Sequence, residues 1–188
     1  MANGTLKVSN IQTSSGSGTI TIGQSGETIS IPSGATVSGA GANAPYFYGE
    51  VASQTEITRA TDTKVVGMTS NEVDSNSAFD GTTFTVPSGT AGKYFITGTL
   101  GAEYGDIGND GEFTKVKIFK NGSSIKVSAF QNSGSNAVQS ETTISVDLIA
   151  DLSVGDTIEL YAYIQDGNGG NGDYFAGRTS LGGYKLIG

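Results

Sequence analysis

The side chains of this sequence that could do chemistry are carboxylates, because the chain contains neither histidine nor cysteine. Histidine is the usual general base and a common metal ligand, and cysteine is the common thiolate nucleophile. Ser-His-Asp and Cys-His catalysis are therefore excluded. Two carboxylates can hydrolyse a glycosidic bond, but no spacing in this chain identifies an acid and a nucleophile. The carboxylates considered are Glu103, Asp106, Glu112 and Asp147. We expect a protein that is not an enzyme.

Two acidic, glycine-rich segments contain the hard oxygen ligands that Ca²⁺ prefers. They are residues 105–112 (GDIGNDGE) and 165–173 (QDGNGGNGD). The first does not fit an EF-hand, because Gly108 stands at the third position and Lys117 where the bidentate glutamate belongs. The second misses the GGxGxD pattern, because Tyr174 replaces the aspartate. The pattern favours surface loops that require no cofactor, with Ca²⁺ binding by Asp106, Asp110 and Glu112 as the alternative.

The loop 165–179 is the best candidate for recognition of another molecule. Small polar residues adapt their hydrogen bonds to a partner, and tyrosine adds rigid contact area. A tolerant connection between two strands is the alternative. The candidate recognition residues are Asp166, Asn168, Asn171, Asp173, Tyr174 and Arg178.

The elements that position these residues are predicted to be β-strands. In residues 79–100 (FDGTTFTVPSGTAGKYFITGTL), a short strand, a Pro-Gly turn and a long alternating strand follow one another. Tyr94, Ile96 and Leu100 point to one face of the long strand, and Phe95, Thr97 and Thr99 to the other. The 29 glycines provide turns between many short strands, so the sequence predicts an all-β fold. Strands are expected at 46–51, 64–68, 82–86, 93–100, 113–120, 124–130, 142–150, 157–165 and 183–187.

Two turns predict how these strands pair. Asn121-Gly122 is typical of a two-residue type I′ hairpin, which requires positive φ at both positions. The strands on either side should therefore pair antiparallel. Residues 152–156 (LSVGD) form a second tight reversal, so we expect the last three strands to form a meander.

Charge and hydropathy exclude several partners. The formal net charge of −8 opposes binding to phosphate backbones, so no nucleic acid is expected. No apolar run approaches the ~20 residues that span a bilayer, so no membrane insertion is expected. The opening residues do not resemble a secretion signal, which predicts synthesis in the cytoplasm.

The first 44 residues differ from the rest of the chain. They are rich in Gly, Ser and Thr, and their short strand-like phrases lack the large apolar residues of a core. We expect residues 1–44 to be an extended, β-rich attachment arm that is ordered by neighbouring chains or a host surface, with an unstructured linker as the alternative. Residues 45–188 are expected to form the globular domain.

One strand has apolar residues on both faces. In residues 158–165, Ile158, Leu160, Ala162 and Ile164 supply one face and Tyr161 and Tyr163 the other, which is more than one sandwich core needs. We expect the two tyrosines to lie in a subunit interface, joined by Phe119 and Tyr104. An exposed sheet face with isolated aromatics is the alternative.

The strand phrases in order resemble C1q/TNF-like jelly-roll domains of the phage and bacterial type. They are PYFYGEV, TKVVGM, FDGTTFTVP, GKYFITGTL, FTKVKIFKNG, TTISVDLIADLSVGDTIELYAYI and LGGYKLI. This resemblance implies a two-sheet, antiparallel jelly-roll β-sandwich that assembles as a homotrimer. The opening LKVSNIQTSSGSGTITI resembles the N-terminal segments of phage fibre-like proteins.

Together these patterns predict a non-enzymatic phage structural protein on the virion surface, made in the host cytoplasm. Residues 1–44 would attach it to capsid or tail proteins, and the trimeric domain would project outward. A head decoration protein or head fibre and a short tail fibre or fibre tip both fit, with adhesion to a host surface glycan or protein. The alternative is a bacterial secreted or surface module that binds glycans or proteins.

Overall fold

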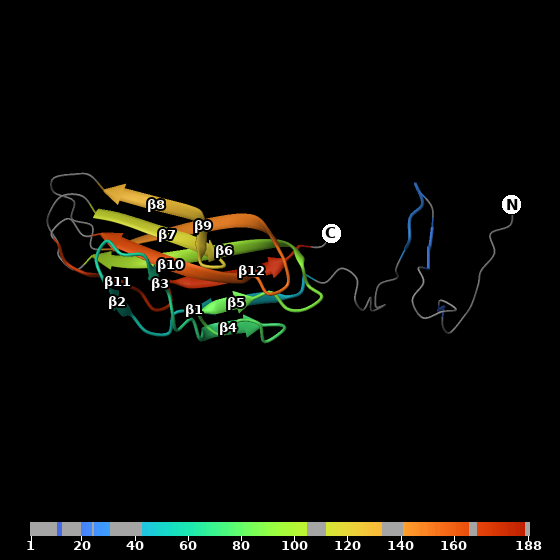
Figure 1. Ribbon diagram of the computed structural model, residues 1–188, viewed down its shortest axis with the longest axis horizontal. Helices are drawn as coiled ribbons and strands as arrows, with labels where there is room; N and C mark the ends of the chain where they lie inside the picture. The colour runs from blue at the N-terminus through green and yellow to red at the C-terminus, as the bar shows by residue number, and fades with distance from the viewer. Residues whose placement is uncertain are drawn as a thin grey trace. The chain divides into compact units, whose positions relative to one another are not determined.

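The computed structural model describes residues 11–12, 20–23, 25–30, 43–104, 112–132, 141–165 and 169–186 (Figure 1). The chain divides into two units, residues 1–40 and residues 41–188, and each is considered by itself. Strands form in the second unit, and no helix occurs among the described residues. The predicted arm, residues 1–44, falls mostly outside the described ranges.

The first sheet, sheet A, has seven strands arranged around β6 (Gly92–Tyr104). Along one edge β6 pairs with β9, and along the other it pairs with β12 and then β11, all antiparallel. β1 and β4 continue the sheet beyond β12, and β2 continues it beyond β11. The bounds are β1 Tyr46–Glu50, β2 Thr55–Ile57, β4 Ser70–Asp74, β9 Glu141–Leu152, β11 Gly172–Tyr174 and β12 Ser180–Lys185.

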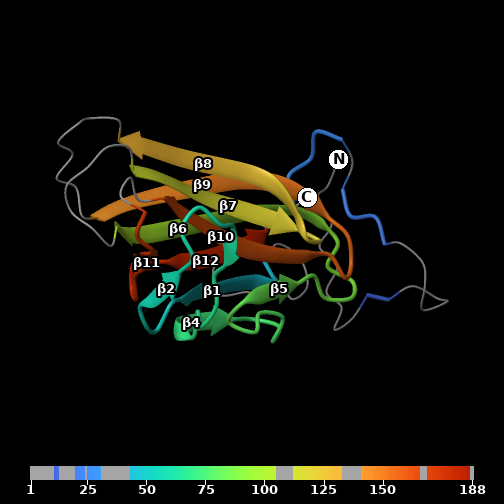
Figure 2. The ribbon, with the colours of Figure 1, turned by 60° about the vertical axis from the view of Figure 1, so that its left-hand side comes forward.

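The second sheet, sheet B, has five antiparallel strands arranged around β10 (Thr157–Gln165). β7 pairs along one edge of β10 and carries β8 on its far side. The other edge of β10 pairs with β5 and β3. The bounds are β3 Thr63–Lys64, β5 Thr83–Thr85, β7 Glu112–Lys120 and β8 Ser123–Asn132. Figures 1 and 2 show β8 along one border of the second unit.

The core lies between the two sheets because their strands alternate in burial. In β10, the side chains of Ile158, Leu160, Ala162 and Ile164 are fully buried while the residues between them are half-buried. Phe47 of sheet A stacks on Phe84 of sheet B with ring centroids 4.0 Å apart. Apolar burial of this kind is the main favourable contribution to folding. The prediction of an all-β antiparallel sandwich is confirmed.

The hairpin predicted at Asn121-Gly122 is confirmed. The two residues have φ values of 50° and 77°, and they join β7 to β8 as an antiparallel pair. The inward and outward faces predicted for the strand at 93–100 are also confirmed, since Tyr94, Ile96 and Leu100 have no exposed surface.

The predicted meander of the last three strands is wrong. β9 pairs with β6 in sheet A, whereas the next strand, β10, pairs with β7, β5 and β3 in sheet B. The turn at residues 153–156 therefore carries the chain from one sheet to the other. Crossing between sheets is what closes the sandwich over its core.

Candidate interaction surfaces

The outer face of sheet A carries a continuous row of apolar side chains across four strands. Tyr46 lies opposite Tyr184, Tyr184 opposite Phe95, and Phe95 opposite Ile149. Residues opposite each other on paired strands share a face and lie in contact. We call Tyr46, Tyr184, Phe95 and Ile149 the sheet A row.

The sheet A row is open to solvent. Ile149 is 64 % exposed, Tyr46 45 % and Tyr184 37 %, while Phe95 is half-buried with its ring centroid 5.5 Å from that of Tyr184. Contiguous exposed apolar surface of this kind marks an interaction site more often than scattered single residues do. The sequence prediction did not include this row, because its four residues come together only through the pairing of strands distant in the sequence.

The outer face of sheet B carries the other aromatic group. Tyr161 stacks on Phe119 with ring centroids 3.9 Å apart, and Tyr163 meets Phe113 edge-on at 5.9 Å. The ammonium of Lys115 lies 4.6 Å from the ring centroids of both Phe113 and Tyr163. Cation–π contacts stabilise such pairs. We call Phe113, Lys115, Phe119, Tyr161 and Tyr163 the sheet B cluster.

The sheet B cluster is half-buried within a single chain, because its rings pack on each other in pairs and the ammonium of Lys115 lies over two of them. The structure thus brings Phe119, Tyr161 and Tyr163 together on one outer face, as expected from the sequence. Their predicted role in a subunit interface stays a prediction.

Tyr104 is not part of that face. Its side chain is 2 % exposed in the core, and its hydroxyl is hydrogen-bonded to that of Thr114 at 2.6 Å. A side chain enclosed by its own chain offers no surface to a second copy. Tyr104 is therefore removed from the candidate interface, because the long strand β6 continues its inward alternation to residue 104.

The predicted recognition loop, residues 165–179, is partly a strand. β11 pairs with both β2 and β6, and Tyr174 is 1 % exposed in the core, so it is removed from the recognition residues. Asn171 accepts a hydrogen bond from the backbone N–H of Arg59 at 3.1 Å and donates one to Glu56. Asp166 and Asn168 lie outside the described residues.

Of the other two candidates, Asp173 belongs to a row of carboxylates at one end of sheet A, and Arg178 contacts the last member of that row. The pairing of β2, β11, β6 and β9 places Glu56, Asp173, Glu103 and Glu141 opposite one another in that order. The amide of Gln54 donates hydrogen bonds to Glu103 at 2.7 Å and Asp173 at 3.2 Å, and Arg178 forms an ion pair with Glu141. Like charges directly opposite each other are destabilising, and these contacts offset that repulsion.

Glu103 and Asp147, two of the carboxylates considered from the sequence, are not placed like a glycosidase pair. Asp147 lies opposite Thr97, six residues along β6 from Glu103, which is about 20 Å at ~3.3 Å per residue. Asp106 lies outside the described residues, as does the side chain of Glu112. The 5–10 Å spacing that glycosidases require is therefore not met by Glu103 and Asp147.

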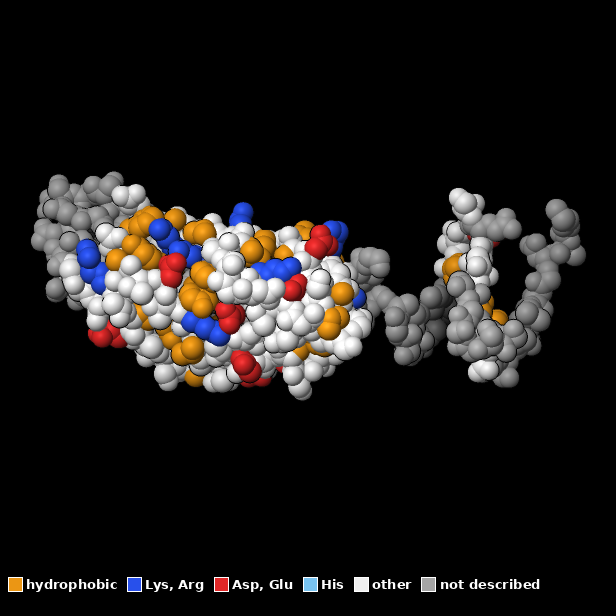
Figure 3. Space-filling model, in the orientation of Figure 1, with side chains coloured by type: hydrophobic (Ala, Val, Ile, Leu, Met, Phe, Trp, Pro, Cys, Tyr) orange, Lys and Arg blue, Asp and Glu red, His pale blue; other side chains and the backbone are white. Residues whose placement is uncertain are grey.

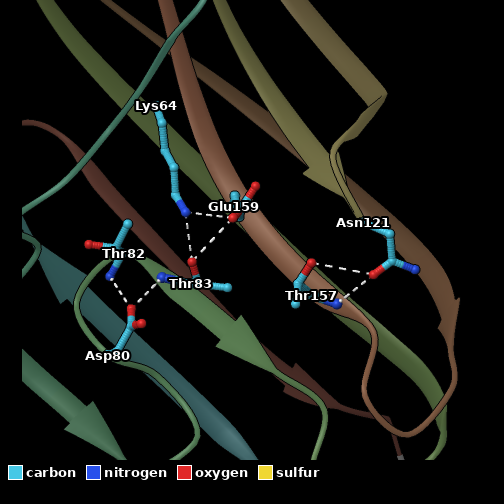
Figure 4. Close-up of polar contacts among 7 residues, drawn as sticks. All are labelled: Lys64, Asp80, Thr82, Thr83, Asn121, Thr157 and Glu159. Carbon is cyan, nitrogen blue, oxygen red and sulfur yellow. Dashed lines mark hydrogen bonds and ion pairs between the residues drawn. The ribbon is translucent and has the colours of Figure 1, made fainter.

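An open pocket of about 360 Å³ lies beside the loop between β4 and β5, lined by Phe79, Asp80, Thr83 and Pro87 among others. One carboxylate oxygen of Asp80, Oδ1, accepts backbone hydrogen bonds from Thr82 at 2.9 Å and Thr83 at 2.6 Å (Figure 4). Beside it, Lys64 bridges Glu159 and the hydroxyl of Thr83 (Figure 4). These polar groups hold the turn before β5 against β10.

In the part of the chain that the structure describes, no group of three or more His, Cys, Asp or Glu side chains is arranged to hold a metal ion. The calcium candidates Asp106 and Asp110 lie outside the described residues, as does the side chain of Glu112. Calcium binding stays a prediction. Among the described residues there is also no helix of the length and apolarity needed to cross a membrane.

Hydrogen bonds shift the pKa of two surface groups. Burial and a hydrogen bond donated to Glu50 raise the pKa of Tyr48, and hydrogen bonds from Tyr48 and Asn71 lower the pKa of Glu50. These hydrogen bonds join Tyr48 and Glu50 of β1 to Asn71 of β4, next to the sheet A row.

No family model matches the chain. No curated protein matches it. Among solved structures, the chain is similar to the globular domain of zebrafish complement 1qA protein, with 14 % identity and a TM-score of 0.49 over 76 % of this chain and 97 % of that one. At this identity the likeness concerns the fold alone, and the two-sheet architecture rests on the strand pairing described above.

Proposed function

We propose that this chain is a non-enzymatic structural and binding protein that assembles as a homotrimer on the surface of a phage particle. The observation that carries the proposal is the sheet A row, an exposed apolar row that crosses β1, β12, β6 and β9. Burying such a row against a second copy removes apolar surface from water at ~25 cal/mol per Å².

The sheet A row is a better candidate for subunit contact than the sheet B cluster. Three of its four side chains are more than one-third exposed in the single chain. The rings of the sheet B cluster already cover one another, so a second copy would remove less of their surface from water. On the face of the second unit that Figure 3 shows, hydrophobic side chains are interspersed with charged ones.

The finer parts of the proposal come from the sequence. Three copies, a capsid or tail attachment through residues 1–44, and adhesion to a host surface glycan or protein are implied by the resemblance to C1q/TNF-like and phage fibre-like segments. A bacterial secreted or surface binding module is the alternative. Mass spectrometry of purified particles tests the location: decoration of the head requires a copy number comparable with capsid lattice sites, and a tail component tens of copies.

The assembly is tested by the solution mass of the full chain. We expect a trimer at micromolar concentration, and a lower mass for the double variant Tyr184→Asp with Ile149→Asp, because buried carboxylates at the contact are strongly unfavourable. The matched control is Val154→Asp, an exposed apolar residue in the turn between β9 and β10, which should leave the mass unchanged.

The double variant Tyr161→Asp with Tyr163→Asp separates the two faces. If it dissociates the assembly and the sheet A variant does not, the contact is the sheet B cluster, as predicted from the sequence. A wild-type chain that stays monomeric at micromolar concentration rejects the proposal. Circular dichroism of each variant verifies that it is folded.

A further inference from the structure

The outer face of sheet B places lysines between aromatic rings. Along β7, the outward residues are in order aromatic, basic, basic and aromatic, and β10 sets a tyrosine opposite each lysine. Tyr163 lies opposite Lys115, and Tyr161 lies opposite Lys117. On the next strand, β8, Val127 lies opposite Lys117 and is 46 % exposed. The rings of the sheet B cluster are half-buried, so each keeps part of its surface open to a ligand.

Lys115 is the lysine of this face that has no carboxylate partner. The two other lysines are each paired within the chain, Lys64 with Glu159 and Lys117 with Asp62. Among the described residues no carboxylate forms an ion pair with Lys115, although the chain has 18 acidic and 10 basic residues. Three lysines against two carboxylates leave this face with an excess of positive charge, which a negatively charged ligand would complement.

The negative charge of the whole chain does not prevent an anion from binding there. The row of carboxylates that includes Glu103 lies on sheet A, and packed sheets are ~10 Å apart. Exposed charges separated by more than ~8 Å are largely screened at physiological ionic strength. Nucleic acid fits this face poorly, because each neutralised phosphate needs its own basic residue, and Lys115 is the one unpaired lysine on the described part of the face.

We propose that the sheet B cluster binds an acidic glycan, meaning a polysaccharide whose sugar rings carry carboxylates. The C–H groups of a sugar ring pack on the negative face of an aromatic ring. The ammonium of Lys115, 4.6 Å from the ring centroids of Phe113 and Tyr163, can donate hydrogen bonds to the carboxylate of a sugar packed on those rings. The hydroxyl of Tyr163 donates to Gln165 at 3.0 Å and can also accept from a sugar hydroxyl.

This inference rests on the glycan adhesion of the proposed function and names the class of glycan. It places the ligand on the outer face of sheet B, whereas the sheet A row lies on the outer face of the other sheet. Assembly and glycan binding would therefore use different faces of the sandwich.

Binding is tested with the full chain by calorimetry against oligomers of galacturonic acid and of sialic acid, with glucose oligomers of equal length as the neutral comparison. We expect at least one acidic oligomer to bind more tightly than the glucose oligomer and to shift the amide NMR signals of β7 and β10. The proposal is overturned if neither acidic oligomer binds, or if the shifts lie outside sheet B. Equal or tighter binding of polyglutamate or oligothymidylate also overturns it, because charge alone would then explain the result.

Two substitutions with the same change of charge locate the site. Lys115→Met keeps the aliphatic stem but removes the ammonium, and it should weaken binding of the acidic oligomer by about tenfold, whereas Lys115→Arg should retain binding. Lys93→Met is the matched control, because Lys93 lies on sheet A and pairs with Asp151 there. Equal losses for Lys93→Met and Lys115→Met would overturn the proposal, since net charge would then determine the affinity.

The solution mass separates this inference from the proposed assembly. A trimer that binds neither acidic oligomer overturns the acidic-glycan site and leaves the assembly. A monomer that binds one of them overturns the assembly and leaves the site. If Lys115→Met dissociates the trimer, a second copy covers the sheet B cluster, and the glycan site is overturned.

Discussion

Asp156 connects two turns through its carboxylate. It accepts hydrogen bonds from the side chain of Asn121 at 2.7 Å and the backbone of Ser153 at 2.8 Å, and it forms an ion pair with Lys120 at 2.8 Å. The contact with Lys120 and these hydrogen bonds lower the pKa of Asp156 to about 2. The ionised carboxylate therefore stabilises the folded chain at neutral pH.

We predict that Asp156→Asn lowers the free energy of unfolding at pH 7 by about 1 kcal/mol, after allowance for solvent screening. A lowered folded-state pKa gives stability that is present above the unfolded-state value of ~3.9 and is lost as the pH falls from there towards 2. The difference between the two proteins should therefore vanish near pH 2 in urea titrations.

Asp151→Asn is the control for this prediction, because Asp151 pairs with Lys93 at 2.8 Å with both side chains more than 60 % exposed. Its effect should be close to zero at every pH. A destabilisation of Asp156→Asn that does not change with pH would contradict the electrostatic explanation.

At the level of elements, β1 approaches the chain after β3 closely at Gly49. A Cβ on Gly49 would lie 2.3 Å from the backbone oxygen of Met68 and 2.8 Å from the ring of Phe79. We predict that Gly49→Ala lowers the free energy of unfolding by about 2 kcal/mol or more, because a backbone atom must move. Chemical denaturation measures the change.

Gly67→Ala is the comparison, because no atom lies within 4 Å of its Cβ position and only its φ of 73° is unfavourable for alanine. It should cost about 1 kcal/mol. Equal losses for the two variants would show that the close approach at Gly49 is relieved without cost.

The long strands could be predicted from the sequence, as could the short strands β1 and β5, whereas β2, β4 and β11 could not. β6, β7, β9 and β10 have nine or more residues each, and apolar residues recur at every second position over much of each strand, so the sequence predicted the strands. β2 and β11 have three residues each and are defined by their partners. The predicted meander was wrong because the sequence of a tight turn does not show whether the next strand stays in the same sheet or crosses to the other.

The candidate surfaces show the same limit. Tyr161 and Tyr163 were recognised because they alternate within one strand, whereas the sheet A row joins Tyr46 to Ile149 through residues far apart in the sequence. Tyr104 and Tyr174 look like surface aromatics in glycine-rich stretches, and only the pairing of β11 with β6 shows that they are enclosed.

For the whole molecule, subunit contact should appear as a concentration-dependent stability. Because only folded subunits associate, association stabilises the folded state, and the thermal midpoint of the wild-type chain should rise with protein concentration. The midpoint of Tyr184→Asp with Ile149→Asp should not. Calorimetry over a hundredfold concentration range measures both, and a wild-type midpoint that does not change would contradict assembly through the sheet A row.

The first and last strands of the sandwich are neighbours, since β1 pairs with β12 and the backbone N–H of Lys185 donates to the oxygen of Pro45 at 2.9 Å. A linker bridging these two points would be short, so the strand order can be rewired by joining them and opening the chain at Asn121-Gly122. A fluorescent protein appended after Lys185 would lie close to Pro45 and the start of β1. A label for imaging is better inserted at that hairpin.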